Sequence, residues 1–174
     1  MKNTDHIPQN AASVRALDAI DRKILGELGR DATLSFSDLS QRVGLSAPAV
    51  HERVKRLKAA GVIKRTVAIL DGPALGKTLL AFVHVDTTGW GKTAALMALA
   101  KLPEVEEIHS ATGDTCLIMK VRVASSEALE GLLSQLYDVD GVRSTRTYVA
   151  LSTHLERTVQ ADISDELALG PHIK

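Results

Sequence analysis

The sequence predicts an α+β protein whose two halves differ in secondary structure, and three observations carry this prediction. Apolar residues recur at helical spacing in residues 17–57, whereas strand-like and helix-like stretches alternate from residue 78 onward. Charge follows the same division. The 174 residues include 21 Lys plus Arg and 21 Asp plus Glu, but residues 1–77 hold 13 basic and 8 acidic residues while residues 78–174 hold 8 and 13. Net charges of +5 and −5 indicate two domains with different partners.

Composition excludes several classes of protein. With 45% hydrophobic and 24% charged residues, the chain is ordinary for a globular protein. No stretch reaches the roughly 18 apolar residues that a membrane span needs, and the N-terminus has no apolar leader segment. The single cysteine, Cys116, fits a reducing compartment. We therefore expect a soluble cytoplasmic protein with no membrane partner.

The basic half is predicted to hold three short helices. Asp18 can cap a first helix near 19–30, and Ser35 can cap a second helix of about two turns that ends at Gly44. Ser46 can cap a third helix, which tolerates Pro48 in its first turn and closes near Gly61. A helix, a short helix, a tight glycine turn and a longer helix have the spacing of a helix-turn-helix unit.

The third helix has one apolar face and one cationic face. Val50, Val54 and Leu57 cluster on the inner face. Residues 42–65 contain seven Lys or Arg and one acid, Glu52, so the outer face can neutralise several phosphates. A basic face can also be merely solvated, without any ligand. The capping pattern and the confinement of positive charge to this segment favour binding of double-stranded DNA instead. The predicted contacts are Ser46, Ala47, Pro48, His51, Arg53, Lys55, Arg56, Lys58, Lys64 and Arg65.

Two of these assignments have particular structural consequences. Lys64 and Arg65 open a predicted β segment from Ile63 to Leu70, which could lie along the DNA backbone as the wing of a winged helix-turn-helix. Arg53 lies nearer the apolar face of its helix, so it is a weaker contact candidate and could pair instead with an acid of the first helix.

The acidic half is predicted to have the element order βαββαβ. Its strands are expected near 78–87, 104–111, 116–123 and 141–151, and its helices at 92–101 and after Ser125 or Ser126. This order defines the ferredoxin-like split βαβ fold, whose open sheet face needs a cover. Dimerisation through that face would supply one.

Catalytic and metal sites have little support in the sequence. Gly91-Lys92-Thr93 looks like the end of a phosphate-binding loop, but Asp86 stands where that loop requires glycine. Cys116 lies among apolar residues, as a buried structural thiol would, and the six histidines show no metal-ligand spacing. We expect no cofactor and no catalytic residue. An enzyme would become conceivable if His84 and His109 met in a pocket.

Two sets of motifs stand out, one in each half of the chain: LDAIDRKIL, VGLS, ERVKRL and GVI in the first, and Thr112-Gly113-Asp114 with the run from Gly141 to Val149 in the second. Through these motifs residues 16–152 resemble the Lrp/AsnC family of amino-acid-sensing transcription regulators, and the two halves match the family pattern independently. The resemblance implies a helix-turn-helix regulator that forms homodimers through its sheets, often assembled into octamers. It also implies an amino-acid effector held between dimers.

The effector residues follow from this resemblance. Gly113, Asp114 and Thr115 become the main candidates, with Thr145 and Thr147 as hydroxyl donors and the loop 139–141 as a wall. Physically, a carboxylate beside a glycine suits an ammonium group, although Gly-Asp is also common in ordinary turns. Where many relatives have an aromatic and a second acid after Gly-Asp, this chain has Thr115, Cys116 and Leu117.

The expected organisation has five parts: a flexible arm at 1–15, the DNA-binding domain at 16–70, a linker at 71–77, the effector-binding and oligomerisation domain at 78–152, and a tail at 153–174 that is either a short docking helix or frayed. Two other functions remain open. Sirohaem decarboxylases resemble this two-part architecture but are enzymes, and an effector-independent protein could shape DNA without sensing anything.

Overall fold

The computed structural model describes residues 17–89, 94–162 and 164. Within these ranges the chain divides into two compact units. The helical unit comprises residues 17–68 together with 156–162 and 164, and the sheet unit comprises residues 69–155. The expected N-terminal arm at 1–15 lies outside the described residues. None of the helices within the described ranges combines the length and the apolar character needed to cross a membrane.

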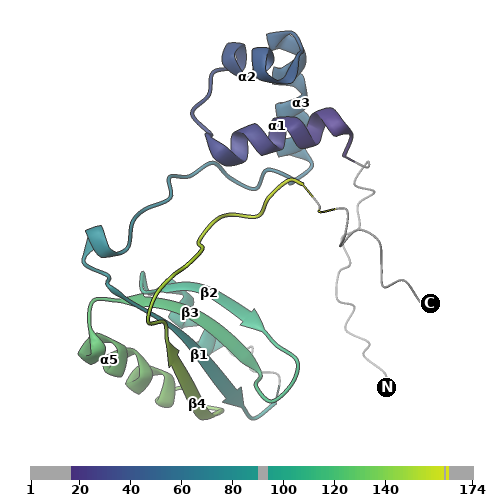
Figure 1. Cartoon of the computed structure of the whole chain (residues 1–174). Coiled ribbons are helices and arrows are strands. Elements are labelled where there is room, and N and C mark those ends of the chain that lie inside the picture. The colour runs from purple at the N-terminus through teal and green to yellow at the C-terminus, as the bar shows by residue number, and fades with distance from the viewer. Residues whose placement is uncertain (1–16, 90–93, 163, 165–174) are drawn as a thin grey trace, which may run out of the picture. The chain divides into compact units, whose positions relative to one another are not determined.

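The helical unit contains the three predicted helices, α1 (Ala19–Arg30), α2 (Phe36–Val43) and α3 (Ala47–Ala59) (Figure 1). Each begins at the expected cap: the side chains of Asp18, Ser35 and Ser46 accept hydrogen bonds from backbone N–H groups three residues further on. Gly44 ends α2 with φ of 74°, a left-handed conformation that favours glycine. The helix-turn-helix prediction is confirmed.

Apolar side chains from all three helices form the core of the helical unit. Ile24, Leu39 and Val50 are completely buried, and Val54 and Leu57 are nearly so. Burial of each such side chain contributes roughly 1.5–3 kcal/mol, so these contacts fix the orientation of α3 against α1 and α2. The predicted inner face of the third helix is therefore correct.

The predicted wing is wrong in one respect, because residues 63–70 form no strand. The segment has the apolar residues that favour a strand, but a strand needs a hydrogen-bonded neighbour, and no other part of the described chain pairs with it. Val67, Ile69 and Leu70 consequently remain exposed.

The sheet unit has the predicted βαββαβ order. Its main elements are β1 (Leu79–Thr87), α4 (Ala94–Ala98), β2 (Val105–Ser110), β3 (Leu117–Val123), α5 (Ser126–Tyr137) and β4 (Val142–Val149). The antiparallel sheet has the order β2-β3-β1-β4. The helix expected at 92–101 is shorter than predicted: α4 passes into a 3-10 turn at Leu99–Lys101, and residues 92 and 93 lie outside the described part.

One face of the sheet packs against helices. Figure 1 shows α5 along this face, and its Leu129, Leu132 and Leu136 share a core with Val83 and Met119 of the central strands. Side chains on the opposite face alternate with these. Phe82 of β1 and Tyr148 of β4, which stand opposite each other in the register, remain 38% and 55% exposed there. We call this second surface the open face.

The C-terminal tail is irregular where it is described, since residues 153–162 form no helix. The docking helix considered from the sequence is therefore absent from this stretch. Ile163 and residues 165–174 lie outside the described residues.

Candidate DNA-binding surface and effector site

The predicted DNA contacts lie on α3, at its cap and just after it. The cap Ser46 and the first-turn Pro48 are exposed, as is His51, whose ring meets the ring of Phe36 edge-on with centroids 5.0 Å apart. Ala47 is partly buried. The N-terminal end of α3 thus presents small and polar groups, the kind of surface that enters a major groove in helix-turn-helix proteins.

Four of the predicted cations make no ion pair within the described residues. Lys55 and Lys58 extend from α3 into solvent, and Lys64 and Arg65 lie on the exposed segment that follows it. Because no carboxylate of the described chain forms an ion pair with them, all four are available to a polyanion. The geometry supports a phosphate-binding face here.

Two arginines of α3 face a buried acid instead. Asp21 of α1, whose side chain is only 5% exposed, lies 2.8 Å from Arg53 and 2.8 Å from Arg56, and Arg53 also bonds Asp18 at 2.7 Å. The hydrogen bond from Arg53 lowers the pKa of Asp18 below its usual value of 3.8. The alternative considered for Arg53 is therefore confirmed.

Arg56 differs from the expectation of a free contact residue. One of its terminal nitrogens donates to both carboxylate oxygens of Asp21, each at 2.8 Å, although 45% of the side chain remains exposed. Helical periodicity places Arg56 on a flank of α3, and its long side chain bridges from that flank to α1. The sequence shows no signal for this second partner of Asp21.

The predicted effector residues lie around the turn between β2 and β3. Gly113 has φ of 116°, so this position favours glycine, and Asp114 beside it is 82% exposed. Thr115 is buried, with its hydroxyl 3.1 Å from the carbonyl of Leu117 and 3.3 Å from that of Val85. A buried hydroxyl that already bonds the backbone is a structural group in this conformation.

Thr145 and Thr147 lie on β4, on the face of the sheet that packs against helices. Thr145 stands opposite Val85 of β1, and the hydroxyl of Thr115 approaches the carbonyl of the same Val85. The structure therefore brings Thr115 and Thr145 near the same residue of β1. The hydroxyl of Thr145 donates to that of Tyr137 at 2.9 Å. Tyr137, at the end of α5 and 57% exposed, is a candidate that sequence reasoning missed.

Asp114 has a cationic partner that sequence reasoning also missed. Arg146 of β4 donates to its carboxylate at 2.9 Å and to its backbone carbonyl at 2.8 Å, and this lowers the pKa of Asp114. An ammonium group would have to displace or share this guanidinium. The partner could not be found from spacing, because 32 residues separate the two positions.

The loop expected to form a wall is held in place by its backbone. Gly141 has φ of 92°, and its carbonyl accepts hydrogen bonds from the backbone N–H and the hydroxyl of Thr88 at 2.8 and 3.3 Å. This contact ties the start of β4 to the end of β1.

His84 and His109 do not come together. Both stand opposite Ile118 of β3, on strands that lie on either side of it, so they are about two strand spacings apart, on the order of 10 Å. His84 contacts the ring of Tyr148, and His109 lies 2.8 Å from Glu107. Among the described residues, no group of three or more His, Cys, Asp or Glu could hold a metal ion.

Comparisons with known proteins agree with both units. The family model of the AsnC-type helix-turn-helix domain matches residues 17–58, and the model of the Lrp/AsnC ligand binding domain matches residues 80–160. The regulator FL11 of Pyrococcus horikoshii is 37% identical over 142 residues, which cover 82% of this chain and 94% of that protein. The leucine-responsive regulatory protein of Escherichia coli is 40% identical over 140 residues, with 78% and 85% covered.

Solved structures show the same relationship. AsnC of Escherichia coli aligns with a TM-score of 0.74 and 29% identity, covering 82% of this chain and 97% of that one. A transcriptional regulator from Neisseria meningitidis in complex with L-Met aligns with a TM-score of 0.77 and 26% identity, covering 87% and 99%.

A helix-turn-helix unit with a cationic third helix, joined to a ligand-binding αβ unit, defines a DNA-binding transcriptional regulator. Both halves match the same family, and they do so at independent positions. The chain belongs to the Lrp/AsnC family.

Proposed function

We propose that this regulator binds double-stranded DNA in a sequence-specific way through α3, as a homo-oligomer, and that an amino acid modulates its DNA binding or assembly. The observation that carries the DNA part is the set of four cations without an ion pair in the described chain, Lys55, Lys58, Lys64 and Arg65, at and after the recognition helix. Ser46, Ala47, Pro48 and His51 are the proposed base-reading residues, and Arg53 and Arg56 orient the helix. The expected location is the cytoplasm, where such a regulator would meet its DNA.

The proposed dimer forms through the open face. Phe82 and Tyr148 expose aromatic surface there, and association would bury it. Two helix-turn-helix units in one dimer would read a pseudo-palindromic site, one half-site each. Association of dimers into octamers is the further step that the family resemblance suggests.

The proposed effector is a free amino acid, which offers an ammonium and a carboxylate. The Neisseria meningitidis relative was solved with L-Met, and the Escherichia coli relative is named for leucine. In this chain Asp114 is the proposed acceptor for the ammonium, beside Gly113, with Thr115, Thr145 and Thr147 as neighbouring groups. We propose no catalytic reaction and no cofactor.

One specific observation favours a second function. Arg146 already occupies the carboxylate of Asp114, and the candidate hydroxyls of Thr115 and Thr145 already have partners. A site satisfied in this way would suit a protein that shapes DNA without an effector. Ligand binding measurements separate the two functions, because only a ligand that binds one state more tightly shifts an equilibrium.

The experiment is a thermal-shift screen of the twenty amino acids, one at a time, with and without genomic DNA fragments selected by the protein. A ligand present at 100 times its dissociation constant stabilises the folded protein by about 2.7 kcal/mol, which is readily measured. For any amino acid that raises the melting temperature, Asp114→Ala should abolish the shift, whereas Glu130→Ala, a change to an exposed acid in the middle of α5, should leave it intact. The absence of any shift with all twenty would favour the architectural function.

A further inference from the structure

Glu52 is an acid in the middle of a surface that is otherwise basic. It lies on the side of α3 away from the buried Val50 and Val54, and 70% of its side chain is exposed. Within residues 42–65 it is the one acid among seven Lys or Arg. A carboxylate here repels the phosphates that the neighbouring cations would neutralise. It therefore lowers the affinity of this face for any DNA unless it meets a hydrogen-bond donor.

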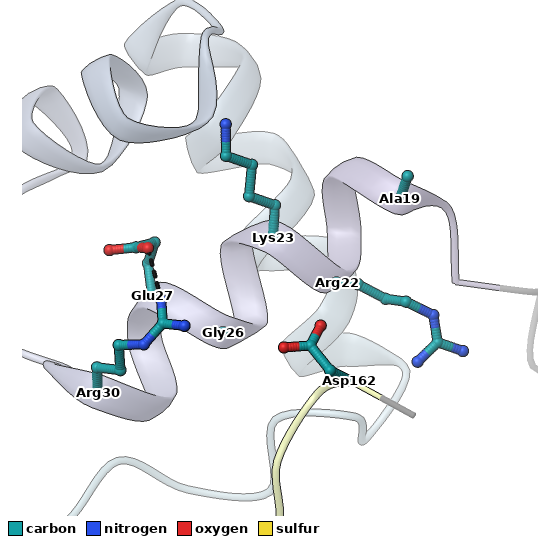
Figure 2. Close-up of a pocket in the computed structure, with 7 residues that line it drawn as sticks. All are labelled: Ala19, Arg22, Lys23, Gly26, Glu27, Arg30 and Asp162. Atoms are coloured by element: carbon teal, nitrogen blue, oxygen red, sulfur yellow. Dashed lines mark hydrogen bonds and ion pairs between the residues drawn. The ribbon is translucent and has the colours of Figure 1, made fainter. Parts of the chain in front are cut away.

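The other acids between residues 17 and 68 accept short hydrogen bonds from side chains. Glu27 pairs with Arg30 at 2.8 Å and with Arg42 at 3.0 Å, and Figure 2 shows the first of these pairs on α1. Guanidinium or hydroxyl groups lie within 2.8 Å of the remaining four, which are Asp18, Asp21, Asp31 and Asp38. Each of these acids thus has a role in holding the helical unit together.

Glu52 has no comparable partner in the part of the chain that the structure describes. Lys55 and Arg56 stand three and four residues further along α3, where a helix often supplies a cation for a glutamate. Arg56 bonds Asp21 instead, and Lys55 forms no ion pair with a described residue. The one ion-pair contact of Glu52 there is with Nδ1 of His51 at 3.5 Å, and an imidazole is charged only when it is protonated. The carboxylate therefore keeps its capacity to accept hydrogen bonds from a ligand.

The position of Glu52 along α3 suits contact with bases. It is the sixth residue of a 13-residue helix, in the N-terminal half that enters the major groove in helix-turn-helix proteins. The adjacent His51 meets Phe36 of α2 edge-on, with ring centroids 5.0 Å apart, so the imidazole contacts an aromatic ring as well as the carboxylate. These contacts restrict the imidazole, and the imidazole in turn restricts how the carboxylate can turn.

The four bases offer a carboxylate different partners in the major groove. Cytosine presents an amino group, N4, with no acceptor beside it on the same base. Adenine presents an amino group next to the acceptor N7, whereas the polar atoms of guanine and thymine in this groove are acceptors only. An ionised carboxylate accepts hydrogen bonds and donates none, so it is attracted by cytosine and repelled by guanine.

We propose that Glu52 is a specificity-determining residue that accepts a hydrogen bond from the N4 amino group of a cytosine in the DNA site. This inference rests on the proposed binding of α3 in the major groove. Lys55 and Lys58 attract phosphates of any sequence, whereas Glu52 rejects sequences that lack the amino group at one position. The loss of general affinity that the acid causes is thus the counterpart of discrimination between bases.

The test is selection of binding sites from a randomised duplex library by the full-length protein and by two variants, Glu52→Gln and Glu52→Ala. The unsubstituted protein should select cytosine at one position, and exchange of that C·G pair for G·C should weaken binding on the order of tenfold. Glu52→Ala should lose this preference and bind unrelated DNA more tightly. Glu52→Gln should shift the preference toward adenine, because an amide donates to N7 and accepts from N6 at the same time.

The controls separate base reading from a general effect of charge. Thermal unfolding checks that each variant folds, as expected for a side chain that is 70% exposed. Glu130→Gln removes the same charge from the exposed side of α5 and should leave the base preference unchanged at every position.

Two outcomes would overturn the proposal, and they can be told apart. Tighter binding to all DNA in Glu52→Gln and Glu52→Ala, with the same base preference as the unsubstituted protein, would mean that Glu52 only repels phosphates; sequence-specific binding would then stand without this contact. If the unsubstituted protein enriched no sequence at all, the proposed sequence-specific function would itself fail, and the role of Glu52 with it.

Discussion

At the scale of single residues, Asp21 links the cap of the first helix to the recognition helix. Its carboxylate is buried and accepts from Arg53 and Arg56, while Asp18 takes the remaining bond from Arg53. From the sequence, an acid at position 21 is expected to stabilise the N-terminal end of the first helix through the helix dipole, and an acid of that helix is a possible partner for Arg53. The sequence does not predict the double role of Asp21, because helical periodicity gives the direction of a side chain but not how far a flexible arginine reaches across to another helix.

Replacing Asp21 with Asn should destabilise the helical unit. The substitution keeps the shape of the side chain but leaves Arg56 without an anionic partner and Arg53 with Asp18 alone. Hydrogen bonds to charged groups contribute about 1.5–3 kcal/mol each. We expect the free energy of unfolding, measured by urea titration, to fall by roughly 2 kcal/mol. Glu52→Gln on α3 is the matched control and should change stability little, because the acid is 70% exposed and its one ion pair within the described residues is with His51.

Stability should also fall with acid in a way that depends on Asp18. Arg53 lowers its pKa in the folded protein, so the unfolded chain binds a proton at Asp18 more readily than the folded chain does. The stabilisation is therefore complete well above pH 3.8, the ordinary pKa, and is lost as the pH falls through the lowered value. Urea titrations from pH 7 to pH 3 should show a shallower acid loss in Asp18→Asn than in the unsubstituted protein. Equal slopes would mean that Arg53 does not hold this carboxylate in solution.

At the scale of elements, the cationic face of α3 consists of fewer free charges than the sequence suggests. Lys55 and Lys58 are unpaired in the described chain, whereas Arg53 and Arg56 direct their charge toward α1. A count of basic residues cannot make this distinction, because it requires the packing of α1 against α3. The same limit explains the missing strand at 63–70, which has the residues of a strand but no neighbour to pair with.

Removing the two unpaired lysines should therefore lower the affinity for DNA and change its sequence preference little. We expect Lys55→Ala with Lys58→Ala to lower affinity for cognate and unrelated DNA alike. The dependence of the logarithm of affinity on the logarithm of salt concentration should fall by about one unit for each phosphate that is no longer neutralised. Fluorescence anisotropy at several salt concentrations measures both quantities. Lys101→Ala, an exposed cation of the sheet unit, is the control. An unchanged salt slope in the double variant would remove this face from the DNA interface.

At the scale of the whole molecule, the overall neutrality of the chain conceals two units with different chemistry. The order of strands and helices in the sheet unit was predictable, since alternation and glycine turns mark each element, and the pairing order followed from the fold class. The surroundings of the effector residues could not be predicted. Arg146 reaches Asp114, and Tyr137 reaches Thr145, only in the folded unit. Residues that meet only when different elements pack together leave no local pattern in a single sequence.

The open face of the sheet gives the last prediction, which concerns assembly. Phe82 and Tyr148 lie opposite each other and leave apolar surface exposed, and a charge introduced between two such faces would lose its hydration when the faces associate. We expect Phe82→Asp to shift the protein from dimer to monomer in size-exclusion chromatography with light scattering, with a cost to association of at least about 2 kcal/mol, as at a central interface residue. Leu75→Asp changes another exposed apolar residue, away from the sheet, and should leave the mass unaltered. A dimer that persists in Phe82→Asp would show that the chains associate through a different surface, and the pseudo-palindromic reading of DNA would then need a different spacing between the two recognition helices.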